Sequence, residues 1–161
     1  MLRSSSGEDP VADYGSLIEA AAQAREMSYS PYSHFRVGAA LLSASGKVYT
    51  GCNIENVAYT PTMCAERVAL GSAIASGERP GSFTAIAVVG DDPEPSTPCG
   101  VCRQILAELA AGALVVMSAA PEKGDGILVL RVEELLPHGF TFGKAKDNSS
   151  KETNKSKPAG F

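Results

Sequence analysis

The chain has 161 residues and a formal net charge of −4, and 44% of its residues are apolar. This length allows one domain with a full hydrophobic core and is short for two. The mildly acidic balance disfavours binding to nucleic acid polymers or to an anionic membrane, so a small-molecule partner is expected. No apolar stretch is long enough to span a bilayer, and the polar N-terminal stretch lacks the apolar segment of a secretory signal, which predicts a cytoplasmic protein.

Both ends of the chain are polar and show no hydrophobic period. Residues 1–10 and 144–161 are therefore expected to be disordered tails around one domain over 11–143. Within the domain, Ala-rich sequence with apolar residues at helical spacing predicts a first helix over 13–27. The breaker-rich sequence SYSPYSH, over 28–34, predicts a fixed loop after it.

Strand signals follow this loop. Segments 37–43 and 48–54 flank the turn sequence ASGK and predict a hairpin. The later periodic segments predict, in chain order, a helix over 64–76, a strand over 83–90, a helix over 102–112, strands over 113–119 and 126–132, and a short helix over 132–137. Strands that alternate with helices after a hairpin predict a three-layer α/β/α sandwich with a five-stranded mixed sheet.

Three of the four cysteines lie in the segments TMCAER, at 62–67, and PCGVCRQ, at 98–104. In a reducing compartment the C-x-x-C spacing indicates a metal site or a redox pair, and a third cysteine in a similar setting favours the metal. Thr97 is a suitable N-cap and Pro98 a suitable first helical residue, which places Cys99 and Cys102 on one face of a first helical turn. Cys64 follows a similar sequence, in which either Thr60 or Thr62 could cap the helix.

Because strand-to-helix loops gather near one edge of such a sheet, the two cysteine segments are expected to meet. The positive ends of helices favour the thiolates that zinc requires. The candidates for a fourth protein ligand are Cys52, His34, His138 and Glu66. Cys52 falls inside a predicted strand, where a small core residue is expected, and neither histidine has ligand-like spacing. Three protein ligands with an open fourth position are typical of a catalytic zinc site.

Glu66 stands two positions after Cys64, a spacing that separates side chains in a helix interior by roughly 200°. In a first turn, however, side chains tilt toward the helix N-terminus, so both can converge on a point beyond the helix end. Glu66 could then reach a water at the metal without binding the metal, which is the position of a general base. The alternative is a solvated carboxylate that the helix dipole stabilises.

Four ordered segments, YSPYSHFRVGAALL, GCNIENVAY, CAER and PCGVCRQ, resemble the small homotetrameric cytidine deaminases. The similarity runs from about residue 13 to 140. It implies that Cys64, Cys99 and Cys102 hold one Zn²⁺ per subunit. It also implies that Glu66 carries the proton from the attacking water to N3 of cytosine and then helps protonate the departing ammonia.

The same resemblance implies a set of substrate contacts. Asn53 and Glu55 would hydrogen-bond the ribose hydroxyls; an amide and a carboxylate at i and i+2 leave a strand on the same face. Without the resemblance, the NIEN sequence would read as an ordinary polar strand end. Phe35 would pack against the pyrimidine ring, and the backbone N–H of Ala65 would contact its carbonyl. Tyr59 and Phe140 would reach across subunit interfaces of a homotetramer, although Phe142 could take the place of Phe140.

Arg67 has an electrostatic role in this interpretation. Three thiolates and Zn²⁺ sum to a negative charge, which opposes ionisation of a water at the metal, and a guanidinium that donates to a ligand sulfur offsets that charge. Gln104 could support the site in a similar way. A surface salt bridge is the alternative role for Arg67.

The sequence therefore predicts hydrolytic deamination of cytidine and deoxycytidine in pyrimidine salvage. A second hypothesis is a blasticidin S-type deaminase, because the ending LLPHGFTF resembles that group, but the NIEN segment and the arginine of CAER favour a nucleoside substrate. A third is a non-catalytic zinc-stabilised module that binds a nucleoside, against which the presence of Glu66 argues. Editing of a nucleic acid polymer is disfavoured by the acidic charge.

Overall fold

The computed structural model describes residues 14–141. The predicted tails at 1–10 and 144–161, and Phe142, lie outside this range. The helices and strands are, in chain order, α1 (Gly15–Arg25), β1 (Val37–Ser43), β2 (Val48–Cys52), α2 (Ala65–Ala75), β3 (Phe83–Gly90), α3 (Gly100–Leu109), β4 (Leu114–Ser118), β5 (Ile127–Arg131) and α4 (Val132–Leu135). Their order is the one that the sequence predicts. No helix among these is long and apolar enough to cross a bilayer.

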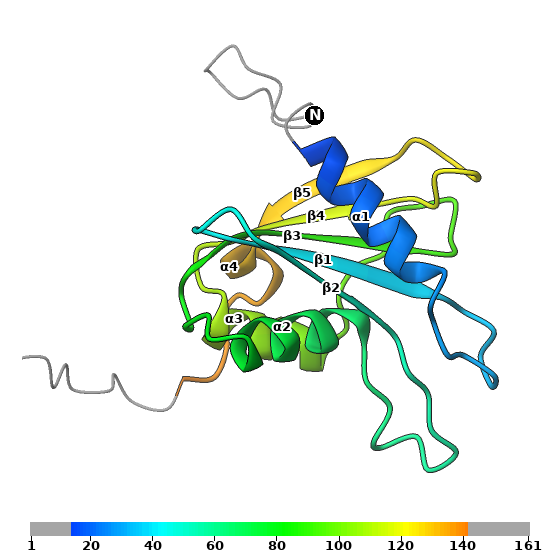
Figure 1. The fold of residues 1–161 in the computed structure, drawn as a ribbon, viewed down its shortest axis with the longest axis horizontal. Coiled ribbons are helices and arrows are strands. Elements are labelled where there is room, and N and C mark those ends of the chain that lie inside the picture. The colour runs from blue at the N-terminus through cyan, green and yellow to red at the C-terminus, as the bar shows by residue number, and fades with distance from the viewer. Residues whose placement is uncertain (1–13, 142–161) are drawn as a thin grey trace, which may run out of the picture.

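The five strands form one mixed sheet in the order β2-β1-β3-β4-β5. The β3 and β4 strands pair in parallel, and the other neighbours are antiparallel. Figure 1 shows α1 against one face of the sheet and α2, α3 and α4 against the other. The predicted three-layer α/β/α sandwich with a five-stranded mixed sheet is thereby confirmed.

The sheet separates two apolar cores because alternate side chains of a strand point to opposite faces. On the side of α1, Leu17 and Ala21 pack against small residues such as Ala40 and Ala87. On the other side, a larger core surrounds residues such as Leu70 and Leu106 of α2 and α3. The β3 strand is buried along almost its whole length, in agreement with its continuous apolar run. This strand is the central support of the sheet, and the segment that carries the second cysteine motif follows its carboxyl end.

Gly51 of β2 allows α2 to approach the sheet closely. A Cβ atom at this position would lie 2.5 Å from the carbonyl oxygen of Ala65 and 2.5 Å from the amide nitrogen of Ala69. Contacts of this length do not occur between unstrained atoms, so only glycine leaves room for the first turn of α2. The start of α2 is therefore fixed directly against the backbone of β2.

Several predicted boundaries differ from the structure by one to three residues, and two of them bear on the site. The second strand ends at Cys52, before the predicted residue 54, although Ile54 continues in extended form through isolated bridges to Tyr29 and Met63. The α3 helix begins at Gly100, so neither Thr97 nor Pro98 has its predicted place at the helix start. The Pro98 carbonyl instead accepts a hydrogen bond of 2.8 Å from the Nε of Arg103.

Candidate metal centre and active site

Cys64 and Cys99 occupy equivalent positions, as the N-caps of α2 and α3. Both have extended backbones, with φ and ψ of −77° and 155° at Cys64 and of −66° and 167° at Cys99. Their carbonyls accept the first helical hydrogen bonds, from Val68 and Arg103 respectively. Neither thiol caps its helix, because sulfur is a weak acceptor, and both remain available as ligands. The predicted caps at Thr60 or Thr62 are therefore replaced by the cysteine itself.

The sulfur atoms of Cys64, Cys99 and Cys102 all lie within 4.8 Å of one another. The distance between the sulfurs of Cys64 and Cys99 is 3.8 Å. Tetrahedral zinc with Zn–S bonds of about 2.3 Å places two sulfur ligands about 3.8 Å apart. The three thiols therefore fit a zinc ion, and the predicted meeting of the two cysteine segments is confirmed.

The charges around the cluster favour thiolate at Cys64. A hydrogen bond from the Cys102 thiol lowers the pKa of Cys64 to about 5, and Arg67 and Cys99 act in the same direction against the effect of burial. Cys102, which gives that hydrogen bond and is fully buried, has its pKa raised. Two helix N-termini also direct their positive ends at the sulfurs. Because zinc binds cysteine as the thiolate, metal binding at the cluster would release protons.

Arg67 is the third residue of α2, and its side chain returns toward the N-cap. Its Nη2 lies 3.8 Å from the Cys64 sulfur and also donates to the Thr62 carbonyl. The bond to the Thr62 carbonyl orients the guanidinium toward the Cys64 sulfur. This contact is the one that charge compensation requires, although the effect on catalysis stays a prediction.

Glu66 is buried, with 4% of its surface exposed. Burial raises the pKa of its carboxyl group; the negative charge of Cys64 acts in the same direction, while a hydrogen bond with the Cys102 thiol opposes it. Glu66 lies in the first turn of α2, two residues after Cys64, so its carboxyl group belongs to the same helix start as this thiol. A carboxyl group with a raised pKa, next to a metal cluster and shielded from bulk water, is suited to accept and return a proton. Its neighbour Ala65 is the first residue of α2, whose N–H has no acceptor within the helix.

Asn53 and Glu55 both turn toward the segment between α1 and β1. The Asn53 amide oxygen accepts from Ser28 and from the backbone N–H of Val37, and its nitrogen donates to the Phe35 carbonyl at 2.8 Å. An amide has two N–H donors and room for two acceptor bonds, so one N–H of Asn53 remains for a ligand.

Glu55 is held in a comparable way. Its carboxylate accepts from the backbone N–H groups of Tyr32 and Ser33 and from the Ser33 hydroxyl. The Ser33 hydroxyl is the main reason that the pKa of Glu55 is lowered. Because a carboxylate offers about four acceptor sites, about one is left for a ligand. Asn53 thus retains a donor and Glu55 an acceptor.

Ser28 and Ser33 are functional neighbours that the sequence interpretation did not identify. They bond the side chains of Asn53 and Glu55 across more than twenty residues of chain. A serine in a polar loop carries no signal of a long-range partner. The one available indication was the density of Ser, Pro and Tyr in SYSPYSH, which suggests a loop with a fixed shape.

Tyr59 and Phe140 are aromatic residues with 70% of their surface exposed. Tyr59 adopts a left-handed backbone, with φ of 59°, and its ring centroid lies 6.4 Å from that of Tyr32. The Phe140 carbonyl accepts a hydrogen bond of 2.9 Å from the Gln104 amide. The structure thus places Gln104 as an anchor of the C-terminal segment, and its predicted support of the metal ligands stays a prediction.

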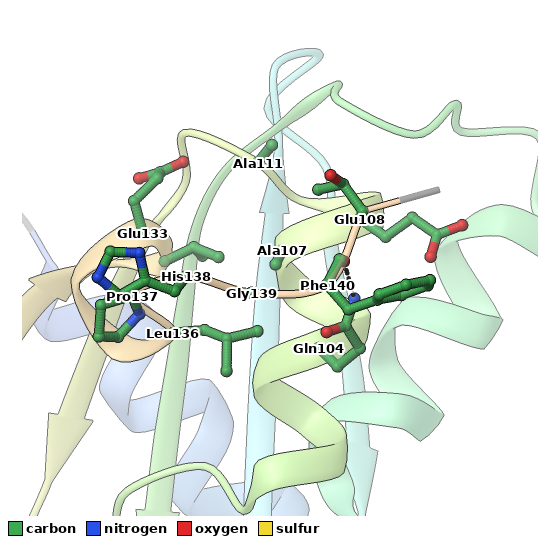
Figure 2. A pocket seen from close by; sticks show the side chains of 12 residues that line it. Gln104, Ala107, Glu108, Ala111, Glu133, Leu136, Pro137, His138, Gly139 and Phe140 are labelled. Atoms are coloured by element: carbon green, nitrogen blue, oxygen red, sulfur yellow. Dashed lines mark hydrogen bonds between the residues drawn. The ribbon is translucent and has the colours of Figure 1, made fainter. Parts of the chain in front are cut away.

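Figure 2 shows this anchor at one end of a groove between α3 and the segment after α4. The groove has a volume of about 900 Å³, and its lining includes Ala107, Glu108, Leu136 and His138. None of its lining residues is a cysteine. This groove is therefore separate from the three cysteines.

The remaining candidate ligands lie outside the cluster. Cys52 is half-buried at the end of β2, where its thiol donates to the Met27 carbonyl and burial raises its pKa. It is therefore less enclosed than the predicted core residue. His34 and His138 are exposed loop residues with left-handed backbones. Within residues 14–141, the group of side chains that could hold a metal comprises the three cysteines alone.

A three-layer sandwich with three thiols at two helix starts, and a buried carboxyl group that is not a ligand, defines a zinc-binding deaminase domain. The comparisons with known proteins agree. The family model described as "Cytidine and deoxycytidylate deaminase zinc-binding region" matches residues 12–118. The chain belongs to the cytidine deaminase family, and it is a zinc-binding hydrolase.

Individual relatives support the same placement. The cytidine deaminase of Sporosarcina psychrophila is 49% identical over 129 residues, which cover 80% of this chain and 92% of that protein. The crystal structure of cytidine deaminase from Burkholderia pseudomallei has a TM-score of 0.72 at 50% identity and covers 78% of this chain and 97% of its own. Blasticidin-S deaminase from Bacillus cereus is more distant, at 30% identity over 133 residues, covering 78% of this chain and 90% of that protein.

Proposed function

We propose that this protein catalyses the zinc-dependent hydrolytic deamination of cytidine and deoxycytidine in pyrimidine salvage. The observation that carries the proposal is the cluster of three thiols within 4.8 Å, with the buried carboxyl group of Glu66 beside it. Relatives at about half identity that are named cytidine deaminase support the choice of substrate.

The reaction adds water to C4 of the base and releases the 4-amino group as ammonia, which leaves uridine or deoxyuridine. Cys64, Cys99 and Cys102 would hold zinc, which supplies a Lewis acid that makes a water nucleophilic near neutral pH. Glu66 accepts a proton from the attacking water and delivers it to N3 as the new C–O bond forms. It then carries the second proton to the amino group as the C–N bond breaks, so that ammonia departs as a neutral molecule.

The remaining site residues would bind and orient the nucleoside. The Ala65 N–H, unpaired within α2, would donate to the carbonyl of the pyrimidine, and the Phe35 ring would pack against its face. Asn53 has one donor left and Glu55 about one acceptor site, and together they match a single hydroxyl group, which both donates and accepts. A site that binds one sugar hydroxyl shared by cytidine and deoxycytidine would accept both substrates.

We also infer a homotetramer whose active sites are completed by neighbouring subunits. The assembly is inferred from the resemblance to homotetrameric cytidine deaminases, in which Tyr59 and Phe140, each 70% exposed, would contact a neighbouring subunit. A cytoplasmic location is inferred from the chemistry of the site, since three thiols that bind zinc must stay reduced.

One experiment tests the substrate. Ammonia release is measured side by side from cytidine, deoxycytidine, cytosine and blasticidin S, on protein whose zinc content is determined in the same preparation. We expect rapid turnover of both nucleosides and weak turnover of cytosine, which lacks the sugar. Faster turnover of blasticidin S than of cytidine would instead identify an antibiotic deaminase, and a zinc-loaded protein that deaminates none of the four would be a binding module.

A further inference from the structure

A network of charged side chains lies beside the proposed nucleoside site, at the carboxyl end of β3. It joins four parts of the chain that are distant in sequence: the end of α1, the residue before β1, the residue after β3 and the loop between β4 and β5. We refer to it as the Asp91 network, and its members are Arg25, Glu26, Arg36, Asp91 and Glu122. The network has no part in the chemistry described above.

Arg25 is the buried end of this network, with 4% of its side chain exposed. It donates to the Gly90 carbonyl at 3.1 Å and pairs with Glu122 at 2.7 Å and with Asp91 at 3.6 Å. The two carboxylates compensate the buried charge, while the Nε of Arg25 is buried with no hydrogen-bond partner among the described residues. Arg25 therefore ties the last residue of β3 and the residue after it to the end of α1.

Asp91 binds Arg36 through three bonds. Its carboxylate accepts from the backbone N–H of Arg36 at 2.9 Å and from the guanidinium Nε and Nη2 at 3.0 Å each. Burial acts to raise the pKa of Asp91, but the bonds and charges of Arg36 and Arg25 outweigh it and hold the pKa below its usual value. A charged, bidentate pair of this kind fixes direction as well as distance. Asp91, which directly follows β3, thus orients both the backbone and the side chain of Arg36.

The residues on either side of Arg36 belong to the proposed substrate site. The Phe35 carbonyl and the Val37 N–H both bond to the Asn53 amide, each at 2.8 Å. The tip of the Phe35 ring lies against Gly90, where a Cβ atom would stand 3.1 Å from Cζ. The three-residue segment 35–37 is therefore held by Asn53 at its two ends and by Asp91 in its middle.

We propose that Asp91 is a positioning residue for nucleoside binding, which acts through Arg36 on the Phe35 ring and on the one free N–H of Asn53. The inference rests on the proposed function, since Phe35 and Asn53 are substrate residues only under it. Arg36 is 37% exposed, so its ion pair with Asp91 contributes little to the free energy of unfolding. The effect of the pair should therefore appear in substrate binding more than in stability.

The test uses Asp91→Asn, which keeps the size of the side chain and removes its charge, and Arg36→Gln, which removes the other partner. Each variant should raise the KM for cytidine about 5- to 10-fold while kcat stays within about twofold, the pattern of lost binding that is shared by ground state and transition state. Zinc content should remain at the wild-type level. Asp91→Glu, which keeps the charge, should recover part of the affinity. Asp125→Asn makes the same chemical change at an exposed loop residue and should leave KM unchanged.

The outcomes separate this inference from the proposed function. Wild-type protein that does not deaminate cytidine contradicts the proposed function before any variant is measured. Active wild-type protein together with an unchanged KM in both variants overturns the positioning role, and so does a fall in kcat or zinc content without a rise in KM. If Asp91→Asn does not fold, the Arg36→Gln variant decides, because its side chain is partly exposed and its removal leaves Arg25 paired with Asp91.

Discussion

Glu66 is the residue at which the sequence and the structure agree most closely. It is buried, and it lies in the first turn of α2, two positions after Cys64, the thiol at the start of that helix. Under the proposed function, this combination would hold the carboxyl group near the zinc without making it the fourth ligand.

Replacement of Glu66 by glutamine should therefore separate binding from chemistry. Glutamine has the same shape but cannot carry a proton, so we expect kcat for cytidine to fall by at least about 10²- to 10⁴-fold, with the zinc content and the melting temperature retained. Loss of absorbance on deamination and metal analysis measure the two effects. Near-normal turnover in this variant would remove Glu66 from the mechanism.

The identity of the ligands could be predicted from sequence because each motif is local. Cys64, Cys99 and Cys102 stand beside helix starts, and those starts were expected at a common edge of the sheet. What the sequence could not indicate were partners set by tertiary structure, such as the bonds of Ser28 to Asn53 or of Arg36 to Asp91. The N-cap position of Cys99 was also missed, since Thr97 and Pro98 are the stronger local signal.

At the scale of elements, the site depends on where α2 begins. The α2 helix carries a ligand, the carboxyl group and the arginine within its cap and first turn, and β2 supports that turn through Gly51. Cys99 and Cys102 belong to a separate helix, α3. The sheet must therefore hold the start of α2 and the start of α3 in fixed positions relative to each other. A small shift of either helix would move the sulfurs out of the tetrahedral arrangement.

Substitution of Gly51 by alanine should produce such a shift. The added methyl group would meet the backbone of Ala65 and Ala69, so α2 must move by several tenths of an ångström or more. We expect lower zinc affinity and a loss of activity that exceeds the loss of stability, measured by metal competition, kinetics and thermal melting. Gly71→Ala, at an exposed site within α2 where no atom would oppose the new Cβ, is the matched control and should have wild-type zinc affinity.

At the scale of the whole molecule, the proposed homotetramer implies that one chain does not complete the site. If Phe140 reaches a neighbouring site, Glu66→Gln and Phe140→Ala chains should complement each other when mixed during refolding or coexpression. A site with the intact Glu66 of one chain and the intact Phe140 of its neighbour would then be active, giving about a quarter of the wild-type activity for random pairing in a symmetric assembly.

Neither variant alone should approach that level. The same mixture made with Phe142→Ala distinguishes the two aromatic residues, and the mass of the assembly in solution gives its subunit number. No recovery with either phenylalanine variant would show that each site is built within one chain.

Because Cys64 and Cys99 cap two different helices, a zinc ion bound to both would cross-link the polypeptide. Cys64 and Cys99 are 35 positions apart, and a bond between them through zinc encloses all of α2 and β3 in a closed loop. By loop-closure entropy, a link of this span disfavours the unfolded chain by roughly 3–4 kcal/mol, in addition to the binding energy of the ion. Chelation should therefore do more than stop the reaction: it should speed unfolding of the central strand and expose an enclosed segment to proteolysis.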